Sequence, residues 1–155
     1  MKSLFLIIAL LYGHVSLAQT PDSYASDVVP ASISGVRIKA ESVFLDDSTT
    51  FVFAVDGNST GIRKKSWSKP VSLQPGTRRI SGSLSYGSYK AYADIEFVAV
   101  SGHDYSLMFS TNAKSRAGDY HCDFWIIDAE SKQVVSDVVR TKVTYPRMTI
   151  PVPVN

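Results

Sequence analysis

The sequence has a single cysteine, Cys122, among its 155 residues, and it has no strong excess of either charge. One cysteine excludes a disulfide framework within the chain. Sixteen Lys and Arg residues against 14 Asp and Glu give a formal net charge of +2, which lacks the dominant basic field that nucleic-acid binding uses. The 9 glycines show no three-residue period, and the 45% hydrophobic content argues against disorder. One folded domain of ordinary composition remains.

A short apolar stretch near the N-terminus has the three-part pattern of a secretory signal peptide. Lys2 gives a positive start, residues 4–12 (LFLIIALLY) are apolar, and residues 16–18 (SLA) place small side chains before a cleavage point. The run is shorter than the roughly 20 residues that a membrane-spanning helix needs. Gln19 follows the cleavage point, where a lipid-anchored bacterial protein would have cysteine. We predict that residues 1–18 are a cleaved signal peptide and that the mature chain is periplasmic or secreted, without a transmembrane segment.

The mature chain alternates apolar and polar residues with a period of two, and no window holds a capped helical stripe. Residues 105–109 place Tyr105, Leu107 and Phe109 on one face. Residues 80–86 place three serines, Ser81, Ser83 and Ser85, opposite apolar side chains, which predicts one dry face and one wet face. Turn chemistry at residues 56–58 (DGN) and 74–77 (QPGT) separates such segments. The sequence predicts an all-β fold, a single antiparallel two-sheet β-sandwich of about seven strands.

Composition divides the mature chain into three parts. Residues 19–34 are rich in Ser, Asp and Pro, which predicts a linker or flexible arm. Residues 35–145 carry the alternating pattern and are the expected β-sandwich domain. Residues 146–155 contain Pro151 and Pro153, which cannot donate a full ladder of hydrogen bonds, so we expect a C-terminal tail there.

Asp119, His121 and Asp123 occupy alternate positions of one predicted strand, so their side chains are expected to share a face. Imidazole and carboxylate groups are suitable ligands for zinc. Two interpretations stay open: a metal site, which would make the protein a small metal-dependent enzyme, and the polar rim of a half-exposed strand. The second is favoured because spacing along one strand does not name a further converging ligand. On that interpretation no cofactor is expected.

The residues that could act as nucleophile or base lack a catalytic setting. Cys122 falls on the apolar face of its strand, and burial there makes a thiol inert. The sequence has no Gly-x-Ser-x-Gly motif. His103 and Asp104 lie in a glycine-containing turn, where aspartate usually bonds to its own backbone. We therefore predict no catalytic residues and a non-enzymatic role.

The densest charge cluster is basic. It consists of Arg63, Lys64 and Lys65, with Trp67 and Lys69 close behind and residues 78–79 (RR) further on. Such a cluster attracts an acidic partner, for example a polyanionic glycan, a lipid headgroup or an acidic protein face. The alternative is a solvated loop whose charges prevent edge-to-edge pairing of strands.

Several turn motifs resemble those of small exported bacterial proteins with PEGA-like or transthyretin-like β-sandwich domains. They are V-D-G at 55–57, L-x-P-G at 73–76 and F-x-A-x-x-G-x-x-Y at 97–105, within residues 51–129. The four-residue Pro-Glu-Gly-Ala signature itself is missing. The resemblance implies an extracytoplasmic accessory module associated with the envelope or with carbohydrate, and it transfers no catalytic residue.

We predict an exported binding module. The prediction combines the signal-peptide pattern, the alternation typical of strands and the lack of a catalytic set of residues. We expect it to recognise an envelope protein or a glycan through its loops or a sheet edge. A secreted inhibitor or effector would show the same sequence features and stays an alternative.

Overall fold

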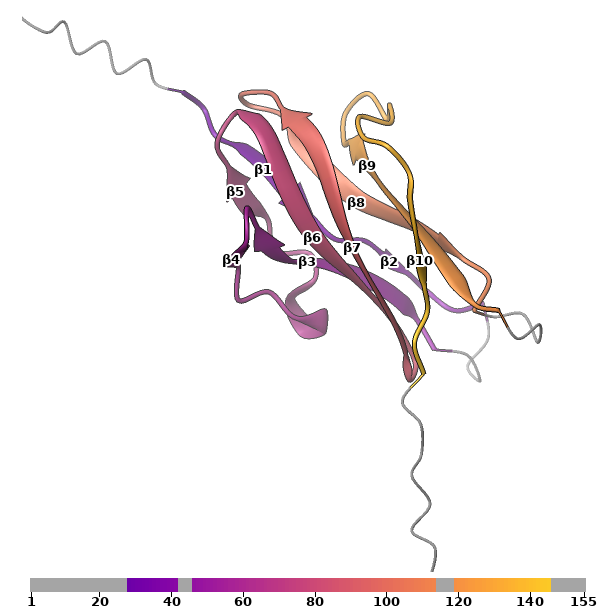
Figure 1. The fold of residues 1–155 in the computed structure, drawn as a ribbon. Coiled ribbons are helices and arrows are strands. Elements are labelled where there is room, and N and C mark those ends of the chain that lie inside the picture. The colour runs from indigo at the N-terminus through magenta and orange to yellow at the C-terminus, as the bar shows by residue number, and fades with distance from the viewer. Residues whose placement is uncertain (1–27, 42–45, 114–118, 146–155) are drawn as a thin grey trace, which may run out of the picture.

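The computed structural model describes residues 28–41, 46–113 and 119–145, which form two β-sheets packed face to face (Figure 1). The prediction of an all-β sandwich is confirmed. The expected signal peptide, residues 1–18, and the expected tail, residues 146–155, lie outside the described residues. Within the described part, no helix has the length and apolar character needed to cross a membrane.

The strands divide into two sheets, which we call sheet A and sheet B. Sheet A has the order β10-β9-β8-β1-β5, and its strands are β1 (Ala31–Ser34), β5 (Val71–Leu73), β8 (Asp104–Thr111), β9 (His121–Asp128) and β10 (Val139–Lys142). Sheet B has the order β2-β3-β6-β7, with β4 beside β3, and its strands are β2 (Arg37–Ile38), β3 (Ser48–Val55), β4 (Asn58–Ser59), β6 (Gly76–Tyr86) and β7 (Tyr89–Ala99). A short 3-10 helix, η1 (Lys64–Ser66), lies between β4 and β5.

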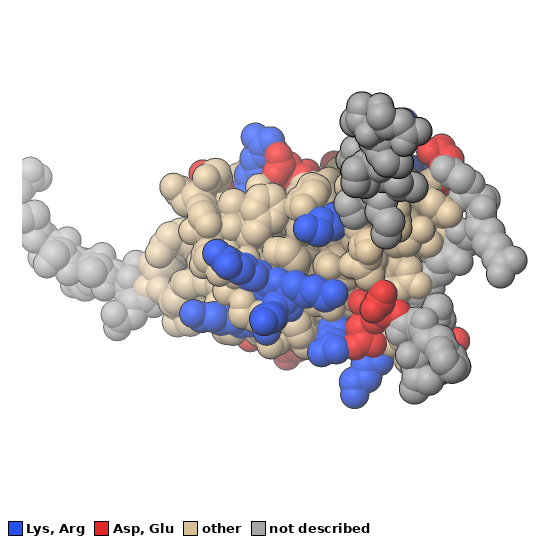
Figure 2. All heavy atoms as spheres, turned by 90° about the horizontal axis from the view of Figure 1, so that it is seen from below, with Lys and Arg blue, Asp and Glu red and all other residues tan. Residues whose placement is uncertain are grey.

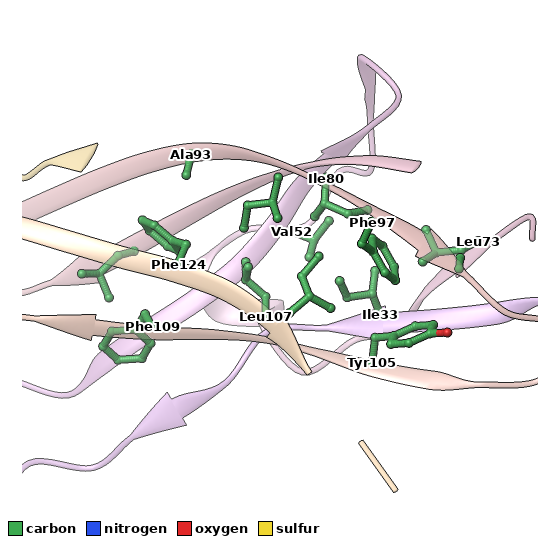
Figure 3. Packing of buried hydrophobic residues seen from close by; sticks show 14 of the residues in the cluster. Ile33, Val52, Leu73, Ile80, Ala93, Phe97, Tyr105, Leu107, Phe109 and Phe124 are labelled. Atoms are coloured by element: carbon green, nitrogen blue, oxygen red, sulfur yellow. The ribbon is translucent and has the colours of Figure 1, made fainter. Parts of the chain in front are cut away.

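The core lies between the two sheets, where the alternating pattern places it. Tyr105, Leu107 and Phe109 of β8 are all buried, as predicted, and they face inward from sheet A. Apolar side chains of β6 and β7 meet them from sheet B (Figure 3). Gly82 of β6 leaves room for Leu107, because a Cβ at that position would lie 2.6 Å from Leu107 Cδ2. The close packing of the sheets therefore depends on a small residue opposite a large one.

The prediction of a linker over residues 19–34 is wrong at its C-terminal end. Residues 31–34 form β1, and Ala31 and Ile33 are buried in the core. This strand lies inside sheet A, antiparallel to β5 and parallel to β8. Sheet A is therefore a mixed sheet and not purely antiparallel. Two alternating apolar residues give too weak a pattern to predict a strand. The same limit explains why about seven strands were expected and ten are present in the described residues.

The prediction of a wet serine face on β6 is also wrong in part. Ser83 is 2% exposed and Ser85 is 7% exposed, whereas Ser81 is half-buried. In the sheet register, Ser83 lies directly between Phe51 of β3 and Tyr92 of β7. Large side chains on both neighbouring strands cover a small one between them, so cross-strand neighbours decide the exposure of this serine.

The chain crosses from sheet A to sheet B between β1 and β2. A Cβ at Gly35 would overlap the carbonyl group of Thr50, so the crossing requires glycine. The N–H of Val36 donates to Thr50 Oγ1 over 2.9 Å, and that hydroxyl donates to the carbonyl oxygen of Leu107 over 2.8 Å. Thr50 is fully buried. One hydroxyl thus joins the crossing segment, sheet B and sheet A.

The two sides of the sandwich are closed differently. On one side, β10 pairs with β9, and the segment around it also bridges to β7 at Phe97–Ser136 and Lys90–Thr144. On the other side, sheet A ends at β5, which pairs with β1 alone in the described structure.

We predict that Thr50→Val lowers the free energy of unfolding by about 1–3 kcal/mol, because it leaves the part-buried Val36 N–H and the buried Leu107 carbonyl without their partner. Chemical denaturation measures this difference. The control is Thr77→Val at an exposed position of β6, which is expected to change stability by less than about 0.5 kcal/mol. Equal effects of the two substitutions would contradict the role assigned to Thr50.

Candidate functional site

The basic segment identified in the sequence forms a compact loop around η1, which we call the basic loop (residues 63–69). The N–H of Arg63 donates to Ser66 Oγ over 3.1 Å, and the N–H of Ser66 returns a bond to the Arg63 carbonyl over 2.9 Å. The N–H of Lys69 donates to the Ser66 carbonyl over 3.0 Å. These local bonds, centred on Ser66, fix the backbone of the loop.

Both ends of the basic loop are attached to the sandwich. On its N-terminal side, Ile62 is buried, and the hydroxyl of Thr60 donates to the Val52 carbonyl of β3 over 2.8 Å. At its other end, the carbonyl of Trp67 accepts the N–H of Gly35 over 3.0 Å, at the sheet crossing. The loop therefore holds its shape without a partner, which lowers the ordering cost of binding one.

The cations of the basic loop have no counter-ions within the described part of the chain. All four are exposed, and none forms a salt bridge with a described residue; they are Arg63, Lys64, Lys65 and Lys69. Trp67 is half-buried between them. Seen from below, the molecule shows Lys and Arg side chains gathered on the face toward which η1 lies (Figure 2). The sequence thus located a surface of concentrated, unpaired positive charge.

The two arginines that extend the cluster in the sequence add no unpaired charge to it, because both are paired with carboxylates. Arg78 forms a 2.9 Å salt bridge with Asp56, and Arg79 forms a 2.7 Å salt bridge with Asp94. Backbone and side-chain hydrogen bonds from these arginines lower the pKa of Asp56. Arg78 and Arg79 are therefore balanced by carboxylates and hold β6 to its neighbours.

Asp119, His121 and Asp123 do not come together as a group of ligands in the structure. Two of the three guanidinium nitrogens of Arg140, Nε and Nη2, donate to the Asp123 carboxylate over 2.7 and 2.8 Å, and this lowers the pKa of Asp123. Nowhere in residues 28–41, 46–113 and 119–145 do three or more His, Cys, Asp or Glu side chains lie close enough to hold a metal ion. Asp119 and His121 line a surface pocket of about 330 Å³ together with Arg140 and Lys142. Its charges are mixed, which fits the polar-rim interpretation.

Sequence reasoning missed a buried carboxylate that pairs with His103. Asp128 is 6% exposed, and its Oδ2 lies 2.7 Å from His103 Nδ1. Its Oδ1 accepts bonds from the N–H and hydroxyl of Ser131, at 2.7 and 2.9 Å. The hydrogen bond from His103, with those from Ser131, holds the pKa of Asp128 well below its usual range. No local sequence pattern predicts this pair. The two residues meet because the pairing of β8 with β9 places Asp128 opposite Tyr105, which is two residues from His103.

The His103–Asp128 pair borders a cavity of about 310 Å³, lined also by Asp104 and Glu130. An aspartate bonded to Nδ1 is the orienting half of a general-base pair. The nearby hydroxyls are used elsewhere, since Ser131 donates to Asp128 and Ser32 donates to Asp104 over 2.6 Å. The geometry therefore makes the pair a tie between the β7–β8 turn and the segment after β9.

Cys122 lies in the core, as predicted. It is fully buried in β9, and this burial raises the pKa of its thiol to about 12. A thiol that stays protonated at neutral pH is a poor nucleophile.

Comparisons with protein-family models, with curated proteins and with solved structures find no match to this chain. The resemblance to PEGA-like and transthyretin-like domains stays a prediction, and the candidate site rests on its own geometry.

We predict that Cys122 reacts with a thiol reagent at pH 8 only after unfolding, because the folded core both covers the sulfur and keeps it protonated. The rate of labelling by a chromogenic disulfide reagent, with and without denaturant, measures this. Rapid labelling of the native protein would contradict the buried position.

We predict that Asp128 makes stability depend on pH in the acid range. Its pKa is lower in the folded than in the unfolded chain, so its contribution is complete above about pH 5 and is lost as the pH falls below about 4. Denaturant unfolding at pH 7 should therefore show a larger difference between wild type and Asp128→Asn than unfolding at pH 3. The same difference at both pH values would refute this assignment.

Proposed function

We propose that the protein is an exported, non-enzymatic binding module that recognises a negatively charged partner of the cell envelope through the basic loop. One observation carries the proposal: four exposed cations stand on a loop fixed at both ends, without counter-ions among the described residues. The arginines Arg37, Arg78, Arg79 and Arg140 are all paired with carboxylates. The basic loop differs from those paired arginines, and it differs from the single exposed lysines elsewhere, such as Lys90 and Lys142, because its four cations lie within seven residues.

Electrostatics favours a partner that meets several of these cations at once. A single exposed ion pair is worth about 0.2–1 kcal/mol, so one contact gives little affinity. Four cations on a fixed loop act together, steer an acidic partner toward the surface and lose little entropy when it binds. The half-buried Trp67 adds apolar contact area at the same place. Such binding weakens as salt is added, because the charges are exposed.

The alternative, a solvated loop that merely keeps strands from pairing, predicts no specific contribution from these residues. A charge-matched comparison separates the two. Lys64 and Lys65 lie on the basic loop, whereas Lys90 and Lys142 are exposed on β7 and β10. Replacing either pair by glutamate changes the net charge by the same amount.

We predict that Lys64→Glu/Lys65→Glu weakens binding of the mature protein to polyglutamate and to heparin at least about 10-fold at low salt, because each reversal replaces attraction with repulsion. Titration calorimetry and the salt concentration that elutes the protein from a heparin column measure this. Lys90→Glu/Lys142→Glu is expected to change binding less than about 2-fold. If both double variants lose the same binding affinity, the effect comes from net charge alone, and the proposal is overturned.

A further inference from the structure

The direction of the backbone groups in β5 follows from the bonds of its neighbour β1. The N–H of Ser32 donates to the carbonyl of His103 over 2.9 Å, so the polar groups of Ser32 point toward β8. Ser72 lies opposite Ser32 in the antiparallel pair of β1 and β5. Because hydrogen-bonded and non-bonded pairs alternate along such a ladder, the N–H and C=O of Ser72 point away from sheet A.

These outward groups are open in the structure. Ser72 is exposed, and its N–H and C=O have no hydrogen-bond partner among the described residues. Val71 and Leu73 make the pairing with Ile33 and Ala31. The opposite side of the sandwich differs, because the segment around β10 bridges sheet A to β7. Among the described residues, β5 is therefore the edge of sheet A that no bridge to sheet B covers.

The charges beside this edge select what can pair with it. The basic loop leads directly into β5, with Lys69 and Pro70 just before Val71. Lysine and proline at a strand edge discourage uncontrolled pairing. A second copy of this chain pairing edge to edge would bring two basic loops together, and like charges oppose that. An extended segment with carboxylate side chains meets complementary charge instead.

We propose that β5 accepts an extended acidic polypeptide segment as an added strand of sheet A. The backbone of Ser72 supplies hydrogen bonds to the segment, and the cations of the basic loop bind its carboxylates. Strand addition of this kind combines main-chain affinity with side-chain selection. The inference rests on the proposed function and narrows it, since it identifies the partner as a protein segment and not a glycan.

The substitution Ser72→Pro tests the backbone contact directly. Proline removes the outward N–H of Ser72 but leaves the bonds between β1 and β5, which Val71 and Leu73 make, and proline is tolerated at strand edges with that geometry. Ser72→Ala is the matched control, because it removes the hydroxyl and keeps the N–H. Denaturant unfolding checks that both variants are folded.

The probe is a short synthetic peptide in which glutamate alternates with valine. Its own control alternates glutamate with proline, which keeps the charge, removes every second N–H group and fixes φ of every proline at about −65°, away from the β-strand value. We expect wild type and Ser72→Ala to bind the glutamate–valine peptide equally and Ser72→Pro to bind it about 10-fold more weakly. The glutamate–proline peptide should bind all three equally and weakly. Calorimetry measures affinity, and slower hydrogen exchange of the Ser72 amide on binding locates the peptide.

The outcomes separate this inference from the proposed function. If Ser72→Pro binds the glutamate–valine peptide like wild type while Lys64→Glu/Lys65→Glu loses it, the added strand is refuted and the basic loop stands. The inference also fails if the acidic polysaccharide binds and the peptide does not, or if the Ser72 amide exchanges at the same rate with and without peptide. If Ser72→Pro does not fold, two measurements on wild type test the inference. They are the exchange rate of the Ser72 amide with and without peptide, and the difference in affinity between the two peptides. If Lys64→Glu/Lys65→Glu binds the peptide and heparin as tightly as wild type does, both the added strand and the proposed function are refuted.

Discussion

The buried hydroxyl of Thr50 and the missing side chain of Gly35 fix the point where the chain passes between the two sheets. Thr50 joins Val36 to Leu107 of the opposite sheet, and Gly35 lets the crossing segment lie directly against β3. This crossing places β1 between β8 and β5. The N–H of Gly35 also holds the carbonyl of Trp67, so the same crossing positions the basic loop. The core and the candidate binding surface thus share one structural constraint.

Charge and strand pairing divide the molecule into two sides with different properties. Where the segment around β10 closes the sandwich, Arg140 is paired with Asp123, and two bridges join that segment to β7. Where sheet A ends at β5, the neighbouring cations have no counter-ions and the outward N–H and C=O of Ser72 have no partner among the described residues. An open edge is a template for pairing with other chains, and the lysines beside it disfavour pairing with segments that carry positive charge.

The tertiary structure sets the partners and surroundings of three residues that could carry chemistry. Asp123 is held by Arg140, Cys122 is covered by the core, and His103 is tied to Asp128. In each case the tertiary partner decided the outcome. A carboxylate that accepts bonds from a guanidinium has lost much of its capacity to bind a metal, and a thiol in apolar surroundings stays protonated.

The sequence by itself determined what short-range pattern can determine. Period-two alternation set the all-β class and the buried faces of β8 and β9, including Cys122, and the run of residues 63–69 located the surface charge. Tertiary structure decided the rest: that residues 31–34 are a strand within sheet A, that Ser83 is covered, and that Asp128 meets His103. Those features depend on partners far along the chain, and pairing across sheets is set by the sum of many contacts that no local window contains.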